Sequence, residues 1–122
     1  MRFARVRESA GAARRMVGGC LADSFTATVF DTAVLLVSEL VTNAVLYGGP
    51  TGAADDLVLR IDAGEDRIRV EVSDGSVEVP IVATGSPETV SGRGMVLVDR
   101  MSSRWGVMPS QIGKIVWFEL DC

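Results

Sequence analysis

Histidine is absent from the 122 residues of this sequence. Its absence excludes histidine-based catalytic triads, histidine metal ligands and phosphohistidine chemistry within this chain. Only two cysteines occur, and they form neither a Cys-x-x-Cys pair nor a metal-ligand spacing. We expect Cys20 to be a small core residue and Cys122 to be exposed, in a reduced cytoplasmic protein.

Aromatic residues are few, at 6%, so the core has to be built from aliphatic side chains and Met. Long hydrophobic runs are also lacking. The longest, residues 32–47, is interrupted by Ser38, Glu39, Thr42 and Asn43. We expect it to be too short and too polar to span a bilayer. No apolar segment follows the arginine-rich start, so the sequence predicts neither a signal peptide nor a membrane partner.

The overall charge balance gives no sign of a nucleic-acid surface. The net charge is −4, although residues 1–20 alone carry five Arg and one Glu. A chain of this charge is not expected to bind nucleic acid directly, and the basic start is more typical of a protein-partner surface or a solvated arm. The length and the hydrophobic content of 48% predict one globular domain over residues 1–122.

Hydrophobic periodicity predicts an α+β fold. Apolar residues recur at helical spacing from Ser9 to Leu21, over residues 28–47 and over residues 92–101, although Gly18 and Gly19 weaken the end of the first helix. Residues 3–7 form a short strand or an ordered arm. Alternating apolar residues predict two hairpins, over residues 57–72 and 104–120. We therefore expect a two-layer sandwich with helices on one face of a mainly antiparallel sheet.

Glu39 and Asn43 are the first candidate site residues. They are four positions apart in the most apolar helix, so they share a face. One interpretation is a solvated stripe on an amphipathic helix. The other is a carboxylate and an amide that project together into a cleft, where a desolvated Glu can act as a general base and an amide oxygen can bind Mg²⁺.

Two glycine-containing motifs follow in the chain. Asp74-Gly75 ends the first hairpin and is either a plain turn or a carboxylate that accepts a hydrogen bond from an aminopurine. Ser91, Gly92, Arg93 and Gly94 precede or open the third helix. They form either a flexible cap or a phosphate site at the helix N-terminus. The aperiodic residues 75–91 between the two motifs predict a functional loop, such as a lid.

The order of these motifs resembles the Bergerat-fold ATP-binding domain of gyrase B, MutL, histidine kinases and bacterial anti-sigma-factor serine kinases. Residues 37–44 resemble the N-box of the anti-sigma-factor branch, residues 74–76 the G1 box and residues 92–95 the G2 box. The resemblance extends from about Ala12 to Leu120 and includes the final hairpin.

The resemblance implies a role for each candidate residue. Asn43 would coordinate Mg²⁺, and Glu39 would be the base that acts on the attacking hydroxyl. Asp74, with Gly75, would bind the adenine of ATP. Residues 91–94 would bind phosphates beneath a lid over residues 77–91.

The implied function is an ATP-dependent serine/threonine protein kinase and anti-sigma factor. Its implied partners are a sigma factor and an anti-anti-sigma protein of the STAS type, and it would form a homodimer through the first helix or strand. The alternative is a non-catalytic regulatory module of the same fold. Two departures from the family pattern point to weaker ATP binding. The run Asp74-Gly75-Ser76-Val77-Glu78 lacks the second Gly of the G1 box, and Lys114 follows Gly113 where many members carry Thr.

Overall fold

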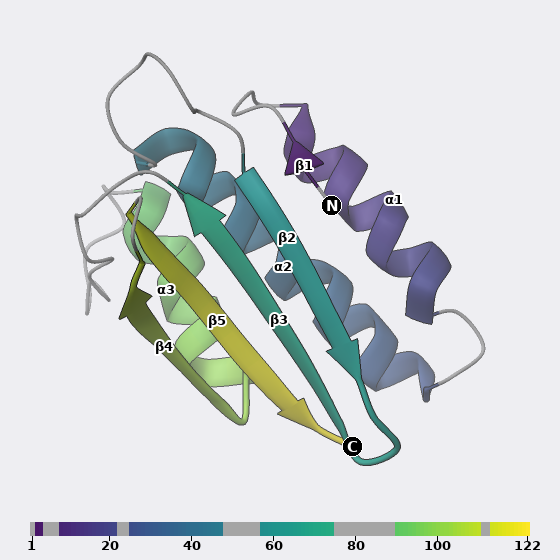
Figure 1. Ribbon diagram of the computed structural model, residues 1–122. Coiled ribbons are helices and arrows are strands. Elements are labelled where there is room, and N and C mark those ends of the chain that lie inside the picture. Colours follow the sequence, from purple (N-terminus) through teal and green to yellow (C-terminus); the bar gives the residue numbers. More distant parts are fainter. Residues whose placement is uncertain (1, 4–7, 22–24, 48–56, 75–89, 111–112) are drawn as a thin grey trace.

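A computed structural model describes the chain except for residues 1, 4–7, 22–24, 48–56, 75–89 and 111–112 (Figure 1). The helices are α1 (Ser9–Leu21), α2 (Ala27–Tyr47) and α3 (Val90–Met101). The strands are β1 (Arg2–Phe3), β2 (Leu57–Ala63), β3 (Arg67–Asp74), β4 (Arg104–Pro109) and β5 (Lys114–Asp121). The predicted order of helices and hairpins is confirmed. The first strand lies at Arg2–Phe3, and of the expected residues 3–7 only Phe3 is among the described residues.

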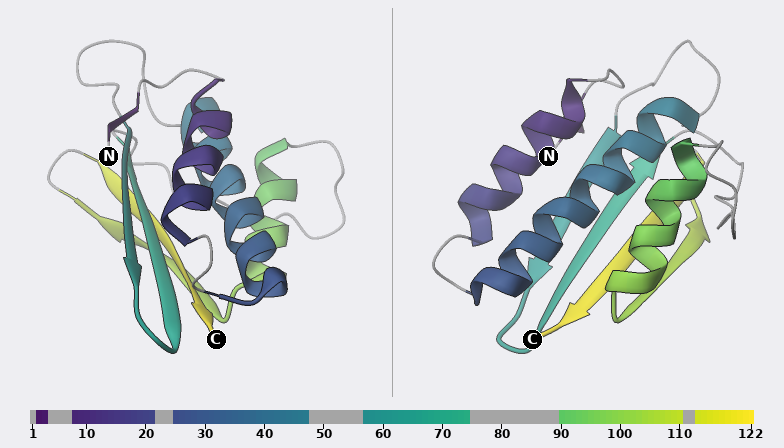
Figure 2. Two further views of the ribbon diagram at one scale, coloured as in Figure 1. Left: turned by 90° about the vertical axis from the view of Figure 1, so that its right-hand side faces the viewer. Right: turned by 180° about the vertical axis from the view of Figure 1, so that it is seen from behind.

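The strands form one antiparallel sheet in the order β1-β2-β3-β5-β4. All three helices cover the same face of this sheet, and no described element covers the opposite face, which we call the open face (Figure 2). The fold is therefore the predicted two-layer α+β sandwich. The residues of β3 alternate between a buried side under the helices and a more exposed side, and those of β5 do so as far as Phe118.

Helix α2 is the central element of the helical layer. Its first turn is capped by Thr26, whose hydroxyl accepts a hydrogen bond from the amide of Val29 at 3.3 Å. Its apolar stripe, which includes Ala33, Leu36, Leu40 and Val41, is almost completely buried against the sheet and the flanking helices.

The expectation that this helix is too short and too polar to cross a bilayer was wrong. Residues 27–45 are long and apolar enough to do so by length and composition, with a mean hydropathy of 1.4. Within this fold the helix has a different role, because its buried stripe forms the centre of the hydrophobic core between α1, α3 and the sheet.

Helix α1 has the expected bounds and differs from expectation at one residue. It continues through Gly18 and Gly19 to Leu21, because Val17 and Leu21 are buried in the core and their packing outweighs the poor helix propensity of glycine. The prediction that Cys20 is a core residue was wrong, since Cys20 is exposed. It directly precedes the buried Leu21, and one helical position rotates a side chain by about 100°.

Candidate functional site

Four element ends meet at one end of the molecule. The C-terminal ends of α2 and β3 lie beside the N-terminal ends of α3 and β5, in the upper left of Figure 1. This arrangement brings the candidate motifs together, because Asn43 lies on the last turns of α2, Asp74 ends β3, and residues 91–94 lie near the N-terminus of α3. Gly75 and residues 77–89 lie outside the residues that the structure describes.

Asn43 and Glu39 differ in burial although they share a helix face. The Asn43 side chain is buried, and Glu39 is only partly exposed. The fully solvated stripe that was one interpretation of this pair is therefore not what the fold contains. Burial raises the pKa of the Glu39 carboxyl, and the positive charge of Arg14 on α1 partly offsets this increase. A carboxylate whose proton affinity is raised is better suited to act as a base.

Residues 91–94 occupy a position that favours anion binding. Helix α3 begins at Val90, so Ser91, Gly92 and Arg93 belong to its first turn and Gly94 follows directly. The first N–H groups of a helix have no acceptor within the helix, and the helix dipole adds a partial positive charge there. The backbone of this segment therefore fits the phosphate site that the glycine pattern predicted.

Asp74 forms a buried ion pair that the sequence did not predict. Its Oδ1 accepts a hydrogen bond from Nζ of Lys114 at 3.1 Å, and the two side chains are 1% and 4% exposed. The two residues face each other across β3 and β5, on the helix-covered side of the sheet. Side chains alternate along a strand, and the pair lies two residues from Val72 on β3 and from Val116 on β5. The pair therefore lies on the same buried face as these two core residues.

The donor set is compatible with Mg²⁺ held mainly by phosphate oxygens. Among the described residues there is no group of three or more His, Cys, Asp or Glu side chains that could enclose a metal. The buried amide of Asn43 offers one hard oxygen ligand, and Mg²⁺ is commonly bound by one or two protein ligands together with substrate phosphates.

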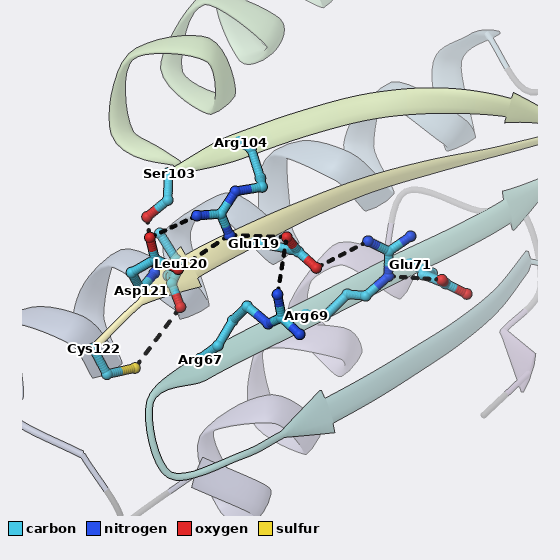
Figure 3. A network of polar contacts seen from close by, with 9 residues as sticks. All are labelled: Arg67, Arg69, Glu71, Ser103, Arg104, Glu119, Leu120, Asp121 and Cys122. Carbon is cyan, nitrogen blue, oxygen red and sulfur yellow. Dashed lines mark hydrogen bonds and ion pairs between the residues drawn. The ribbon is translucent and has the colours of Figure 1, made fainter.

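A second polar cluster lies on the open face of the sheet, far from these motifs in the register (Figure 3). Glu119 accepts hydrogen bonds from Nη1 of Arg69 at 3.1 Å and Nη1 of Arg104 at 2.9 Å. Arg104 also pairs with Asp121 at 2.6 Å. These hydrogen bonds lower the pKa of the Glu119 and Asp121 carboxyls.

The Arg69 guanidinium completes this cluster. It donates from Nε to Glu71 at 3.0 Å and lies 4.3 Å from the centre of the Trp117 ring. The outward alternation of Arg67, Arg69 and Glu71 was visible in the sequence. Their partners on β4 and β5 depend on the strand register, which the sequence did not supply.

Comparison with known families agrees with this architecture. A family model described as the histidine kinase-like ATPase domain matches residues 3–120. The match covers nearly the whole chain, so the protein belongs to the histidine kinase-like ATPase domain family. A search of the curated proteins found no match.

Proposed function

We propose that this protein is an ATP-dependent serine/threonine protein kinase of the anti-sigma-factor type. The observation that carries the proposal is the partly buried carboxylate of Glu39, with its raised pKa, one helical turn before the buried amide of Asn43. Membership of the histidine kinase-like ATPase family supports ATP as the nucleotide. Without histidine, the chain has no residue for autophosphorylation of the histidine-kinase type.

In this proposal each candidate residue acts by position or charge. Glu39 accepts the proton of the substrate hydroxyl, and Asp74, beside Gly75, reads the base of ATP. The amides of residues 91–94 bind phosphate oxygens, with Arg93 as an added cation. Asn43 would hold Mg²⁺, which neutralises phosphate charge when bound. Phosphoryl transfer depends mainly on such positioning and charge neutralisation.

The proposed partners are proteins. They are a sigma factor, which the chain would hold, and an anti-anti-sigma protein of the STAS type, which it would phosphorylate in the cytoplasm. The negative net charge supports protein partners over direct contact with nucleic acid. A homodimer through α1 or β1 is part of the same proposal.

The test is transfer of radiolabelled phosphate from Mg-ATP to a Ser-bearing STAS protein that co-purifies with the chain. Transfer to the wild-type partner and none to its Ser→Ala form would support the kinase. Tight partner binding without any transfer would instead support the alternative function.

The alternative is a non-catalytic ATP-binding or partner-binding regulatory module of the same fold. The buried pair of Lys114 and Asp74 favours it, because a cation already occupies a carboxylate that the kinase would use to read adenine. A thermal-shift series separates the kinase from a module that binds no nucleotide, and the transfer assay separates it from one that binds ATP without catalysis. A nucleotide present at 100 times its dissociation constant adds about 2.7 kcal/mol to the free energy of unfolding, and a module that does not bind nucleotide shows no shift.

A further inference from the structure

The lysine of the buried ion pair is the only lysine in the sequence; the other eleven basic residues are arginines. Its ammonium is directed at Asp74, the residue whose carboxylate reads the base in the proposed function. The pair is closely held, with an Nζ–Oδ1 distance of 3.1 Å, and its two residues face each other in the register of β3 and β5. Both side chains are buried together, so a base that reaches the Asp74 carboxylate also meets the ammonium.

The ion pair is not readily opened by a neutral ligand. A charged group taken out of water requires a partner, and removing one partner leaves the other charge uncompensated. The amino group of adenine is neutral, and its hydrogen bond to a carboxylate is weaker than that of an ammonium. A base that docks at Asp74 therefore meets the carboxylate and the ammonium together.

We propose that Lys114 sets the base selectivity of this site, so that it accepts purines with an exocyclic carbonyl as well as purines with an exocyclic amino group. The inference rests on the proposed nucleotide-binding function and names the ligand class of the same site. Its ligands are the triphosphates of adenosine, inosine and guanosine.

A carboxylate alone discriminates strongly between these bases. It accepts a hydrogen bond from the amino group of adenine. It has no hydrogen to offer the carbonyl of hypoxanthine, and the two oxygens repel each other. A site with an unmatched polar contact rejects that ligand, because both groups lose their water without a replacement.

The pair of carboxylate and ammonium removes this discrimination. Adenine presents a donor beside an acceptor, the amino group and the adjacent ring nitrogen. Hypoxanthine presents the reverse order, a carbonyl acceptor beside a ring N–H donor. Asp74 accepts a hydrogen bond and Lys114 donates one. The amino group of adenine therefore meets Asp74 and its ring nitrogen meets Lys114, whereas the ring N–H of hypoxanthine meets Asp74 and its carbonyl meets Lys114.

Adenosine and inosine triphosphates are the matched probes, because they differ only at this edge of the base. Calorimetry of the wild-type chain with each Mg-nucleotide gives the ratio of the two dissociation constants. We expect the two constants to agree within about threefold. Preference for ATP by about tenfold or more, the effect of one hydrogen bond to a charged group, overturns the inference without any variant.

Two variants then assign the effect to the ammonium. Lys114→Thr removes it, and Lys114→Met removes it while keeping the length of the side chain, in case the smaller residue impairs folding. Both should shift the ratio toward ATP by about tenfold. Arg60→Gln is the matched control, since it removes one positive charge from an exposed position on β2 and should leave the ratio unchanged. An unchanged ratio in both folded Lys114 variants overturns the inference.

The single lysine also provides a direct signal. Isotope-labelled lysine gives one side-chain ammonium resonance, and we expect it to move when either nucleotide binds. A resonance that does not move while a nucleotide binds overturns the role of Lys114 and leaves the nucleotide-binding function standing. If neither nucleotide binds wild type or any variant, the proposed function itself fails, and the inference fails with it.

Discussion

At the scale of single residues, the surroundings shift the pKa values of two glutamates in opposite directions. Burial raises the pKa of Glu39, whereas the hydrogen bond from Arg104 lowers the pKa of Glu119. Glu119 is the more buried of the two by solvent exposure, at 6%, yet it has cationic partners on either side. Partners, more than burial, therefore distinguish a structural carboxylate from a candidate catalytic one.

Replacing Glu39 by Gln tests the catalytic role. Gln keeps the size of the side chain but cannot accept a proton, so phosphoryl transfer should fall by about 10²–10⁴-fold while nucleotide and partner binding are retained. Phosphate transfer and calorimetry on the same preparation measure both properties. Transfer at the wild-type rate would assign the proton to another group. Asn43→Ala is the contrasting variant and should lose the Mg²⁺-dependent part of nucleotide affinity.

The same substitution should change the dependence of stability on pH. The folded state holds the Glu39 proton more tightly than the unfolded state, so its contribution to stability is present at low pH and is lost as pH rises through the raised pKa. Glu39→Gln should therefore be more stable than wild type at neutral pH, and the difference should disappear in acid. Urea denaturation at a series of pH values measures it. A variant less stable than wild type at neutral pH would contradict this linkage.

Asp74 carries a structural role as well as the proposed one. Asp74→Ala leaves the Lys114 ammonium buried without its carboxylate, and loss of one partner of a buried ion pair costs about 3–5 kcal/mol. The double variant Asp74→Ala, Lys114→Met should recover most of that loss, because both charges are then gone. Chemical denaturation measures the free energies, and a double variant no more stable than the single one would argue against the pairing. Neither variant should bind ATP with wild-type affinity.

At the scale of helices and strands, sequence periodicity predicted most of the fold. The order of helices and hairpins and the face covered by helices followed from spacing alone. The errors came from tertiary packing: the phase of α1, which exposes Cys20, is set by the burial of Val17 and Leu21. The pairing of Asp74 with Lys114 spans 40 residues and depends on how β5 aligns with β3, which no local pattern specifies.

The hairpin of β4 and β5 contains a close approach that only glycine permits. A Cβ added at Gly106 would lie 2.8 Å from Cζ2 of Trp117, its cross-strand neighbour. Gly106→Ala should therefore destabilise the fold by about 1–3 kcal/mol through overpacking. Gly19→Ala in α1 is the control, because a Cβ there meets nothing within 4 Å. It should instead stabilise the helix by roughly 0.5–1 kcal/mol. Thermal unfolding compares the two, and equal effects would contradict the steric explanation.

At the scale of the whole molecule, the two faces of the sheet hold different groups of residues. The helix-covered face holds the hydrophobic core and, at one end, the candidate site residues (Figure 1). The open face holds the charged cluster around Glu119, which links β3, β4 and β5 (Figure 3). We expect the cluster to stabilise the sheet from the side that none of the described helices covers, so its titration should be visible in the global unfolding transition.

Acid unfolding tests that contribution. The lowered pKa of Glu119 means that its stabilisation is present above the ordinary value of 4.5 and is lost as pH falls through the lowered folded value. Glu119→Gln lacks this ionised form, so it should be less stable than wild type at neutral pH, and the difference should shrink on acidification. Glu65→Gln, in the exposed turn between β2 and β3, is the control and should follow wild type throughout. Denaturation midpoints from pH 7 down to about pH 3 measure the three proteins. A gap between wild type and Glu119→Gln that stays constant over this range would show that the carboxylate acts by packing alone.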